Sequence, residues 1–313
     1  MRHRTRVKRW HDPRMSMDQL LDRIMAKFTP ATPIRVVVPS SDKASAKRYA
    51  RVEKARAKVQ GIRDRRRFKT APVPTGEVRV VVSEDTSGTI FPKTVLEWSP
   101  EIDEEIFKDG ANNSKIGGDV LVGRLRGAKI FTLALEERAT CPRSCHMWTK
   151  CMGNACHLTR RWKDTPALRE AIARDLDAMC AQHEKVLIRL HVLGDFVDGA
   201  YLGLWEDALG RNDNLNVFGF TAHRPDSDMG RAITMVRGDF GMRFAIRHSG
   251  TEGQWGCTTI DHPTEAPHID RGSSRGIVCP EQRSAMGDIR DEVHCGSCGI
   301  CWKSQSEIVF IEH

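Results

Sequence analysis

The stretch from Ala139 to Arg161 holds a dense group of potential metal ligands. Four cysteines fall within sixteen residues, and a histidine directly follows two of them; the set is Cys141, Cys145, Cys151 and Cys156, with His146 and His157. Thiolate sulfur is a soft ligand that selects zinc or iron–sulfur clusters over hard cations. The stretch therefore predicts a metal site at its four cysteines.

A second group of cysteines lies near the C-terminus. After one isolated cysteine, the segment HCGSCGICW places three more at two-residue gaps. The C-x-x-C-x-x-C spacing lets one tight, glycine-assisted turn direct three sulfurs at a single centre. We therefore predict a second metal site at Cys279, Cys295, Cys298 and Cys301. The other two cysteines, Cys180 and Cys257, lie outside both groups.

The alternative for these cysteines is a disulfide framework, which is typical of small secreted domains. The N-terminus is rich in arginine and has no apolar core of a signal peptide, so we expect a cytoplasmic protein with reduced thiols. Structural zinc usually pairs two C-x-x-C knuckles, whereas the spacing from Cys141 to Cys156 is wider and irregular. This irregularity favours a [4Fe–4S] cluster at the first group, with zinc as the alternative. The second group fits either.

Basic residues are concentrated at the N-terminus. Residues 1–70 hold 21 Lys and Arg against 6 Asp and Glu, whereas the remaining residues hold 28 against 35, so the formal charge of +8 combines a basic arm with a mildly acidic body. Such asymmetry indicates a polyanionic partner, of which nucleic acid is the commonest. A solvated linker is the alternative for this arm. No apolar run is long enough to span a bilayer, so we expect no membrane partner.

The central part of the chain is predicted to alternate strands and helices. A buried strand at 130–137 leads into the first cysteine group, and later strands are expected at 186–196, 216–223 and 242–249. Helices are expected between them, at 164–179, 201–209 and 228–236. Because this alternation implies right-handed crossovers, it predicts an α/β fold with a parallel, partial TIM-barrel-like sheet.

The rest of the chain gives weaker patterns. Helices are expected at 16–28 and 45–67, strands at 34–38 and 77–83, and a short acidic helix at 94–110. We predict three parts: a basic arm at 1–70, a barrel-like catalytic body at 71–278, and a cysteine-rich C-terminal segment at 279–313.

Polar residues stand at the ends of three consecutive predicted strands. Asp195 follows Gly194, His223 ends the next strand, and Arg247 and His248 end the third. Because the carboxyl ends of parallel strands gather ligands and chemistry, we expect Asp195, His223 and His248 to be catalytic and Arg247 to bind a cofactor. Gly194 gives the backbone freedom to present Asp195, whose roles include binding a substrate, acting as a base and acting as a nucleophile. A helix cap or a satisfied buried group is the alternative for each residue alone.

The segment LHVLGDFVDGAYLGLW at 190–205, the upstream cysteine-rich turn and the terminal CGSCGICW carry a family resemblance. Together they resemble the bacteriophage "gene product eighty-eight" family, over roughly residues 128–313. The resemblance implies a barrel-like α/β body with cysteine-bound metal, similar to radical S-adenosylmethionine enzymes, and hence S-adenosylmethionine as a cofactor. The chain departs from the C-x3-C-x2-C pattern of those enzymes: position 148 is Trp, so Cys151 would be the third ligand.

Two classes of function follow. The first is an iron–sulfur enzyme that acts on nucleic acid or a nucleotide, such as a phage-type base-modifying enzyme working in the host cytoplasm. A variant of it is base exchange as in transglycosylases, in which Asp195 attacks the sugar carbon and the cysteines hold structural zinc. The second class is a non-catalytic nucleic-acid-binding protein whose metal sites only fold the loops.

Overall fold

The computed structural model describes residues 82–269, 276–285 and 293–311. The chain divides into two units, Met1–Lys69 and Thr70–His313, and every described residue belongs to the second. Several predicted elements lie outside the described residues: the helices at 16–28 and 45–67, the strand at 34–38, and all but the last two residues of the strand at 77–83.

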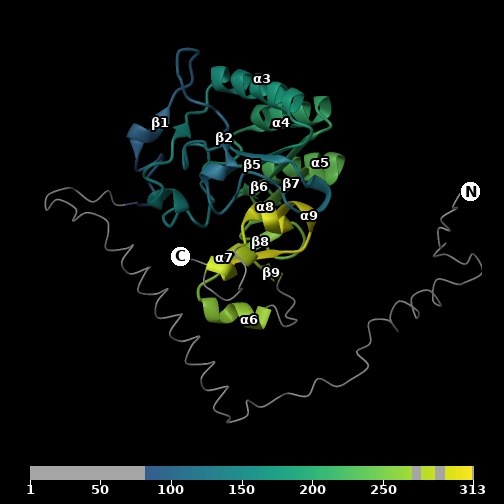
Figure 1. The fold of residues 1–313 in the computed structure, drawn as a ribbon. Helices are drawn as coiled ribbons and strands as arrows, with labels where there is room; N and C mark the ends of the chain where they lie inside the picture. Colours follow the sequence, from purple (N-terminus) through teal and green to yellow (C-terminus); the bar gives the residue numbers. More distant parts are fainter. Residues whose placement is uncertain (1–81, 270–275, 286–292, 312–313) are drawn as a thin grey trace, which may run out of the picture. The chain divides into compact units, whose positions relative to one another are not determined.

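Among the described residues, eight strands form one sheet, in the order β2-β3-β5-β6-β7-β8-β10-β9 (Figure 1). All neighbours in it run parallel except β2, which pairs antiparallel with β3 at one edge. Its strands are β2 (Lys108–Asp109), β3 (Lys129–Thr132), β5 (Val186–Leu190), β6 (Leu215–Thr221), β7 (Phe244–Ser249), β8 (Gly256–Ile260), β9 (Ile277–Val278) and β10 (Ile308–Ile311). Two further strands, β1 (Val95–Leu96) and β4 (Arg161–Trp162), form a separate parallel pair.

Three longer helices connect the central strands: α3 (Pro166–Gln182), α4 (Gly199–Arg211) and α5 (Asp228–Phe240). Each begins at a polar side chain that accepts a main-chain N–H of the first turn, as N-caps do: Thr165 for α3, Asp198 for α4 and Ser227 for α5. The shorter helices are α6 (Ala266–Ile269), α7 (Pro280–Ala285), α8 (Cys295–Cys298) and α9 (Ile300–Lys303).

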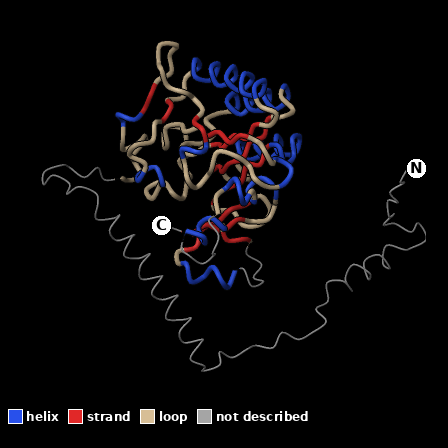
Figure 2. The backbone as a smooth tube through the Cα atoms, viewed as in Figure 1, coloured by secondary structure: helices blue, strands red, loops and turns tan. Residues whose placement is uncertain are grey.

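The strands from β3 to β8 follow one another in the sheet in the same order as in the chain. Because each right-handed crossover then moves in one direction, the connecting helices lie on the same face of the sheet. Figure 1 shows α3, α4 and α5 on one side of the sheet and α8 and α9 on the other, and Figure 2 shows the strands between these layers. The helices α3, α4 and α5 thus cover one face of the sheet, and the helices α8 and α9 of the C-terminal segment cover the other.

Alternate residues of the strands supply the two hydrophobic layers. On β5, Val186, Ile188 and Leu190 pack with the helices α3, α4 and α5. Leu187, between them, faces the other layer, which includes Phe218 of β6, Trp302 of α9 and three buried cysteines, Cys257, Cys279 and Cys301. Strands that are apolar on both faces are typical of a parallel sheet covered on both sides, as the sequence indicated for 186–196.

The α/β alternation predicted for the central chain is confirmed, with strands somewhat shorter than expected. The acidic helix predicted at 94–110 is wrong: β1, a series of turns and β2 occupy these residues. Pro100 interrupts any helix there, and the neighbouring residues Ile106 and Phe107 are both buried against the helical layer. The C-terminal strands β8, β9 and β10 were not predicted, because they are short and lie among turn-forming residues.

The described strands do not close into a barrel, because β2 and β9 stand at opposite ends of the strand order and are not paired. The described strands thus do not show closure into a barrel, which stays a prediction. Within the described part of the chain, no helix combines the length and apolar character needed to cross a membrane.

Candidate functional site at the carboxyl edge of the sheet

Asp195 lies in the turn that follows β5, and its side chain is buried. Its Oδ1 accepts the main-chain N–H of Phe196 at 2.8 Å, and its Oδ2 accepts that of Ala222 at 2.6 Å. Because Ala222 directly follows β6, the carboxylate joins the ends of two strands. The preceding Gly194 has a φ of 86°, and a Cβ there would lie 2.7 Å from Thr140 Oγ1, so this turn requires glycine.

The two predicted histidines continue this chain of contacts. His223 Nε2 lies 2.8 Å from the carbonyl oxygen of Phe196, and His248 Nδ1 lies 3.0 Å from that of His223. Burial raises the pKa of Asp195, while the charge of nearby His223 opposes the shift. The structure thus brings Asp195, His223 and His248 together at the ends of β5, β6 and β7. Their main-chain partners mean that they also hold these strand ends to one another.

The first cysteine group lies beside Asp195. The pKa of Cys141 is raised mainly by burial, then by the charges of Asp195, Cys145 and Cys151. The pKa of Cys145 is raised by burial and also by Cys151 and Asp195. Cys156 contributes to the raised pKa of Cys151. Cys141 and Cys145 are therefore the thiols nearest the buried carboxylate, and the main-chain N–H of Asp195 donates to Thr140 Oγ1, next to Cys141, at 3.2 Å.

Main-chain N–H groups point at three of these sulfurs. The N–H of Gly153 donates to Cys151 Sγ with an N···S distance of 3.4 Å, at the start of the 3-10 helix η4 (Met152–Ala155). The main-chain N–H groups of Met147 and Arg138 likewise lower the pKa of Cys145 and of Cys141. Each bond lowers the pKa of its thiol, against the effect of burial. The bonds favour the thiolate, which is the form that binds metal.

A buried ion pair, missed by the sequence analysis, anchors this loop. Arg161 Nε donates to Glu137 Oε2 at 2.6 Å, and both side chains are almost fully buried. The remaining donors of Arg161 reach main-chain carbonyls of the cysteine loop, including Gly153 at 3.1 Å, Cys156 at 3.1 Å and Thr159 at 2.6 Å. The only sequence signal was the position of these opposite charges on either side of the cysteines.

Arg138 is a second buried cation next to the loop. Its Nε donates to the Trp148 carbonyl at 3.1 Å and its Nη2 to Asn154 Oδ1 at 2.5 Å. Its charge lowers the pKa of Cys145 and Cys151. The loop is therefore built around two arginines, Arg138 and Arg161, whose charges oppose the rise in the pKa of neighbouring cysteines.

The second cysteine group brings three of its four predicted members together. Burial raises the pKa of Cys295 to about 11, and Cys279 adds to the shift. The pKa of Cys301 is raised by burial and then by Cys295 and Cys279. Cys298, on α8, is not among the groups that shift these pKa values. Main-chain N–H groups of Gln282 and Glu281 donate to Cys279 and lower its pKa.

This second group lies on the sheet face opposite α3, α4 and α5. The ring of Trp302, next to Cys301, lies 4.7 Å from that of Phe218 on β6. Arg247, predicted to bind a cofactor, is fully buried here and donates to main-chain carbonyls, among them Ser306 at 2.7 Å and Cys301 at 3.3 Å. In this structure Arg247 holds the C-terminal segment against the sheet.

The cysteines form two separate groups of free thiols. All ten are without a disulfide bond, and none from one group is among the causes that shift a pKa in the other. Within the described ranges, no three His, Cys, Asp or Glu side chains meet closely enough to hold one metal ion. The thiols of each group are therefore neighbours without surrounding a single point.

His191 is a further buried residue that the sequence analysis missed, because it stands inside the apolar run of β5 and its extension. Its Nε2 lies 3.0 Å from the hydroxyl of Tyr201, and its Nδ1 is buried without a hydrogen-bond partner. Burial, followed by the charge of Arg189, lowers the pKa of His191 to about 3. The imidazole is therefore neutral at physiological pH.

This lowered pKa predicts a loss of stability in acid. An unfolded histidine titrates at about 6.5, so between pH 6.5 and about 3 the unfolded chain binds a proton that the folded chain excludes. Stability from His191 is complete above this range and falls as the pH decreases through it. We expect the loss of unfolding free energy from pH 7 to pH 5 to be smaller in His191→Gln than in the unchanged protein, by about 2 kcal/mol. Urea denaturation at both pH values measures this, and an identical pH dependence would contradict it.

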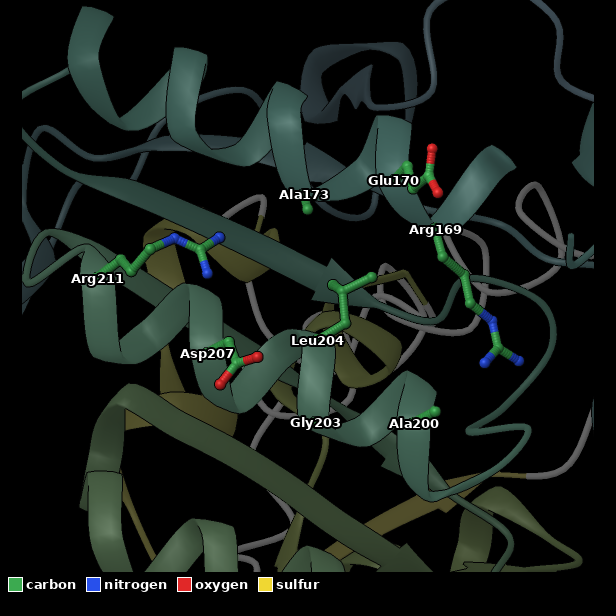
Figure 3. A pocket seen from close by; sticks show the side chains of 8 residues that line it. All are labelled: Arg169, Glu170, Ala173, Ala200, Gly203, Leu204, Asp207 and Arg211. Atoms are coloured by element: carbon green, nitrogen blue, oxygen red, sulfur yellow. The ribbon is translucent and has the colours of Figure 1, made fainter. Parts of the chain in front are cut away.

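A surface groove lies between α3 and α4 (Figure 3), and the residues that line it differ from those of the cysteine groups and the strand ends. Small side chains form part of its lining, and charged ones flank it: Ala173, Ala200, Gly203, Arg169, Asp207 and Arg211. It includes no cysteine and no residue from the strand ends. The carboxyl edge with the first cysteine group is therefore the better candidate site.

Comparisons of the chain with protein families, with curated proteins and with solved structures give no match. The resemblance to the phage family remains a prediction, and function is argued below from the residues themselves.

Proposed function

We propose that this protein is an iron–sulfur enzyme that acts on nucleic acid, with a cluster held by the first cysteine group. The observation that carries the proposal is the position of Cys141 and Cys145 near buried Asp195, together with the main-chain N–H of Gly153 that donates to Cys151 in the same loop. Hydrogen bonds to cysteine sulfur are one of the means by which proteins tune iron–sulfur clusters.

The spacing of the thiols supports a cluster over a single zinc ion. Zinc binds sulfur at about 2.3 Å, so all four ligands of one ion must converge on one point. The wide and irregular spacing from Cys141 to Cys156 does not match the paired C-x-x-C knuckles of structural zinc. A multi-iron cluster binds each cysteine at a different iron and so accepts a wider separation. Structural zinc stays the alternative, for the second group in particular.

Each residue of the site would have a different role. Cys141, Cys145 and Cys151 would hold the cluster, which supplies one-electron chemistry when bound. If S-adenosylmethionine is the cofactor, as the family resemblance implies, it would lie at the same edge. Asp195 would keep the ends of β5 and β6 in register next to Cys141 and Cys145.

The contacts of Asp195 weigh against the base-exchange variant. Both of its carboxylate oxygens already accept main-chain N–H groups, from Phe196 and Ala222, and the side chain is only 2% exposed. A nucleophile must present a free lone pair to the substrate carbon. Asp195 is therefore better suited to positioning than to covalent attack.

The nucleic-acid part of the proposal is supported by charge. Residues 1–70 carry 21 Lys and Arg against 6 Asp and Glu. Cations spaced in this way bind a phosphate backbone by releasing its counterions. The same charge also fits the second candidate, a non-catalytic binding protein. The two candidates are distinguished by whether the protein modifies nucleosides.

The test is purification of the full chain without oxygen, followed by measurement of iron, sulfide and zinc per chain, the visible absorption spectrum and electron paramagnetic resonance. We expect a brown protein with iron and sulfide, and a reduced form with a resonance signal. The protein is then incubated with oligonucleotides, reductant and S-adenosylmethionine, and the nucleosides are analysed by mass spectrometry. A colourless protein with stoichiometric zinc would contradict the cluster. An intact cluster with no altered nucleoside in any DNA or RNA tested would favour the non-catalytic candidate.

A further inference from the structure

The loop that carries the first cysteine group is cationic over its exposed surface. The 25 residues from Ala139 to Lys163 include no Asp or Glu. Arg143, Lys150 and Arg160 are exposed there, as are His146 and His157. One of these five residues therefore stands within two positions of each of the four cysteines. The sequence analysis placed the basic partner-binding region at 1–70 and overlooked this second one, because the body as a whole is mildly acidic.

Two large apolar side chains are exposed in the same loop. Leu158 is 83% exposed and Met152 is 55% exposed, and they are two of five large hydrophobic residues exposed among the described residues. A single exposed apolar residue is common on protein surfaces, but here both lie among cations. Apolar side chains next to Lys and Arg are typical of surfaces that contact the bases or sugars of a nucleic acid while cations bind its phosphates.

The loop is held in a defined shape, so these side chains present a fixed surface. Arg161 and Arg138 bind its carbonyls from inside. At the outer side, the guanidinium of Arg143 lies 4.7 Å from the ring centre of Trp148 and donates to the main-chain carbonyl of Glu84 at 2.8 Å. The interior arginines are thus used for structure, and Lys150 and Arg160 lie on the exposed outer side of the loop.

We propose that the exposed face of the cysteine loop, residues 142–160, binds the phosphate backbone of a nucleic-acid strand and holds it over Cys141 and Cys145. This inference rests on the proposed function and names the part of the body that meets the substrate. The basic arm then supplies affinity, and the cysteine loop places the strand at the reactive edge.

The first test compares two double variants of the full chain, each lacking two exposed cations. Lys150→Gln with Arg160→Gln removes charge from the loop; Arg174→Gln with Lys303→Gln removes it from α3 and α9. Binding of a fluorescent single-stranded oligonucleotide is measured over a range of salt concentrations. Each phosphate contact contributes about 0.7 to the slope of log affinity against log salt on single strands, so the loop variant should lose about 1.4 and the control variant none. An unchanged slope in the loop variant would overturn the proposal.

The second test locates the strand directly. The photoreactive amino acid p-benzoylphenylalanine is placed at position 158, and at the exposed Met235 on α5 as a control, since Met235 is 71% exposed. We expect illumination to cross-link the oligonucleotide at 158 and not at 235. Cross-linking at neither position, or equally at both, would place the strand elsewhere. Both tests measure binding of the oligonucleotide and not the presence of the cluster. Failure of this inference is therefore distinguishable from failure of the proposed function, which is tested by iron and sulfide content.

Discussion

Replacing Arg161 with methionine is expected to lower the free energy of unfolding by about 3–5 kcal/mol. The side chains of Arg161 and Glu137 are 0% and 1% exposed, so the substitution leaves a carboxylate buried without its partner. It also releases the main-chain carbonyls of Gly153, Cys156 and Thr159. Urea denaturation measures the loss, and the reaction rate of Cys156 with a thiol reagent in metal-free protein reports whether the loop opens.

Two matched variants show whether burial of the pair is the cause. Arg161→Met combined with Glu137→Leu removes both charges, and we expect it to recover most of the loss, because a buried pair can often be replaced by apolar groups at little cost. Lys163→Gln disrupts the neighbouring pair with Glu97, which is largely exposed, and should leave the denaturation midpoint unchanged. If the single Arg161 variant were as stable as the Lys163 variant, the ion pair would not be the anchor of the loop.

Replacing Cys145 with serine is expected to remove the iron of the first site, with loss of its absorption and of any nucleoside modification. Cys145 takes part in the mutual pKa effects of the first group and accepts a main-chain N–H, so it lies within the proposed ligand set. Serine keeps nearly the same size but lacks the soft sulfur that iron–sulfur clusters require. Iron and sulfide per chain, measured after anaerobic purification, give the readout.

Cysteines outside the proposed ligand set serve as controls. Cys180→Ser, on the helix α3, should leave the iron content unchanged. At the second site, Cys301→Ser should remove its metal, whereas Cys298→Ser should retain most of it, since Cys279 and Cys295 but not Cys298 are among the main causes of the raised pKa of Cys301. Equal loss in Cys298→Ser and Cys301→Ser would show that the second site uses all four cysteines, as the C-x-x-C-x-x-C spacing first indicated.

The sequence alone predicted the elements whose patterns are local. The strand predicted at 186–196 and the helix predicted at 164–179 follow from residue types within a few positions, and the structure has them at Val186–Leu190 and Pro166–Gln182. The alternation of strand and helix was enough to predict a parallel sheet. Since parallel strands bring their carboxyl ends to one edge, it also placed Asp195, His223 and His248 near one another.

The tertiary structure decided what depends on contacts between distant segments. Glu137 and Arg161 lie 24 residues apart in the sequence, and no local pattern shows that their charges pair in the interior of a loop. The same holds for β10, which enters the sheet between β8 and β9. The separation of the cysteines into two groups likewise depends on how the chain folds back on itself. Residue type and spacing determine which groups can bind metal, but only packing determines which of them meet.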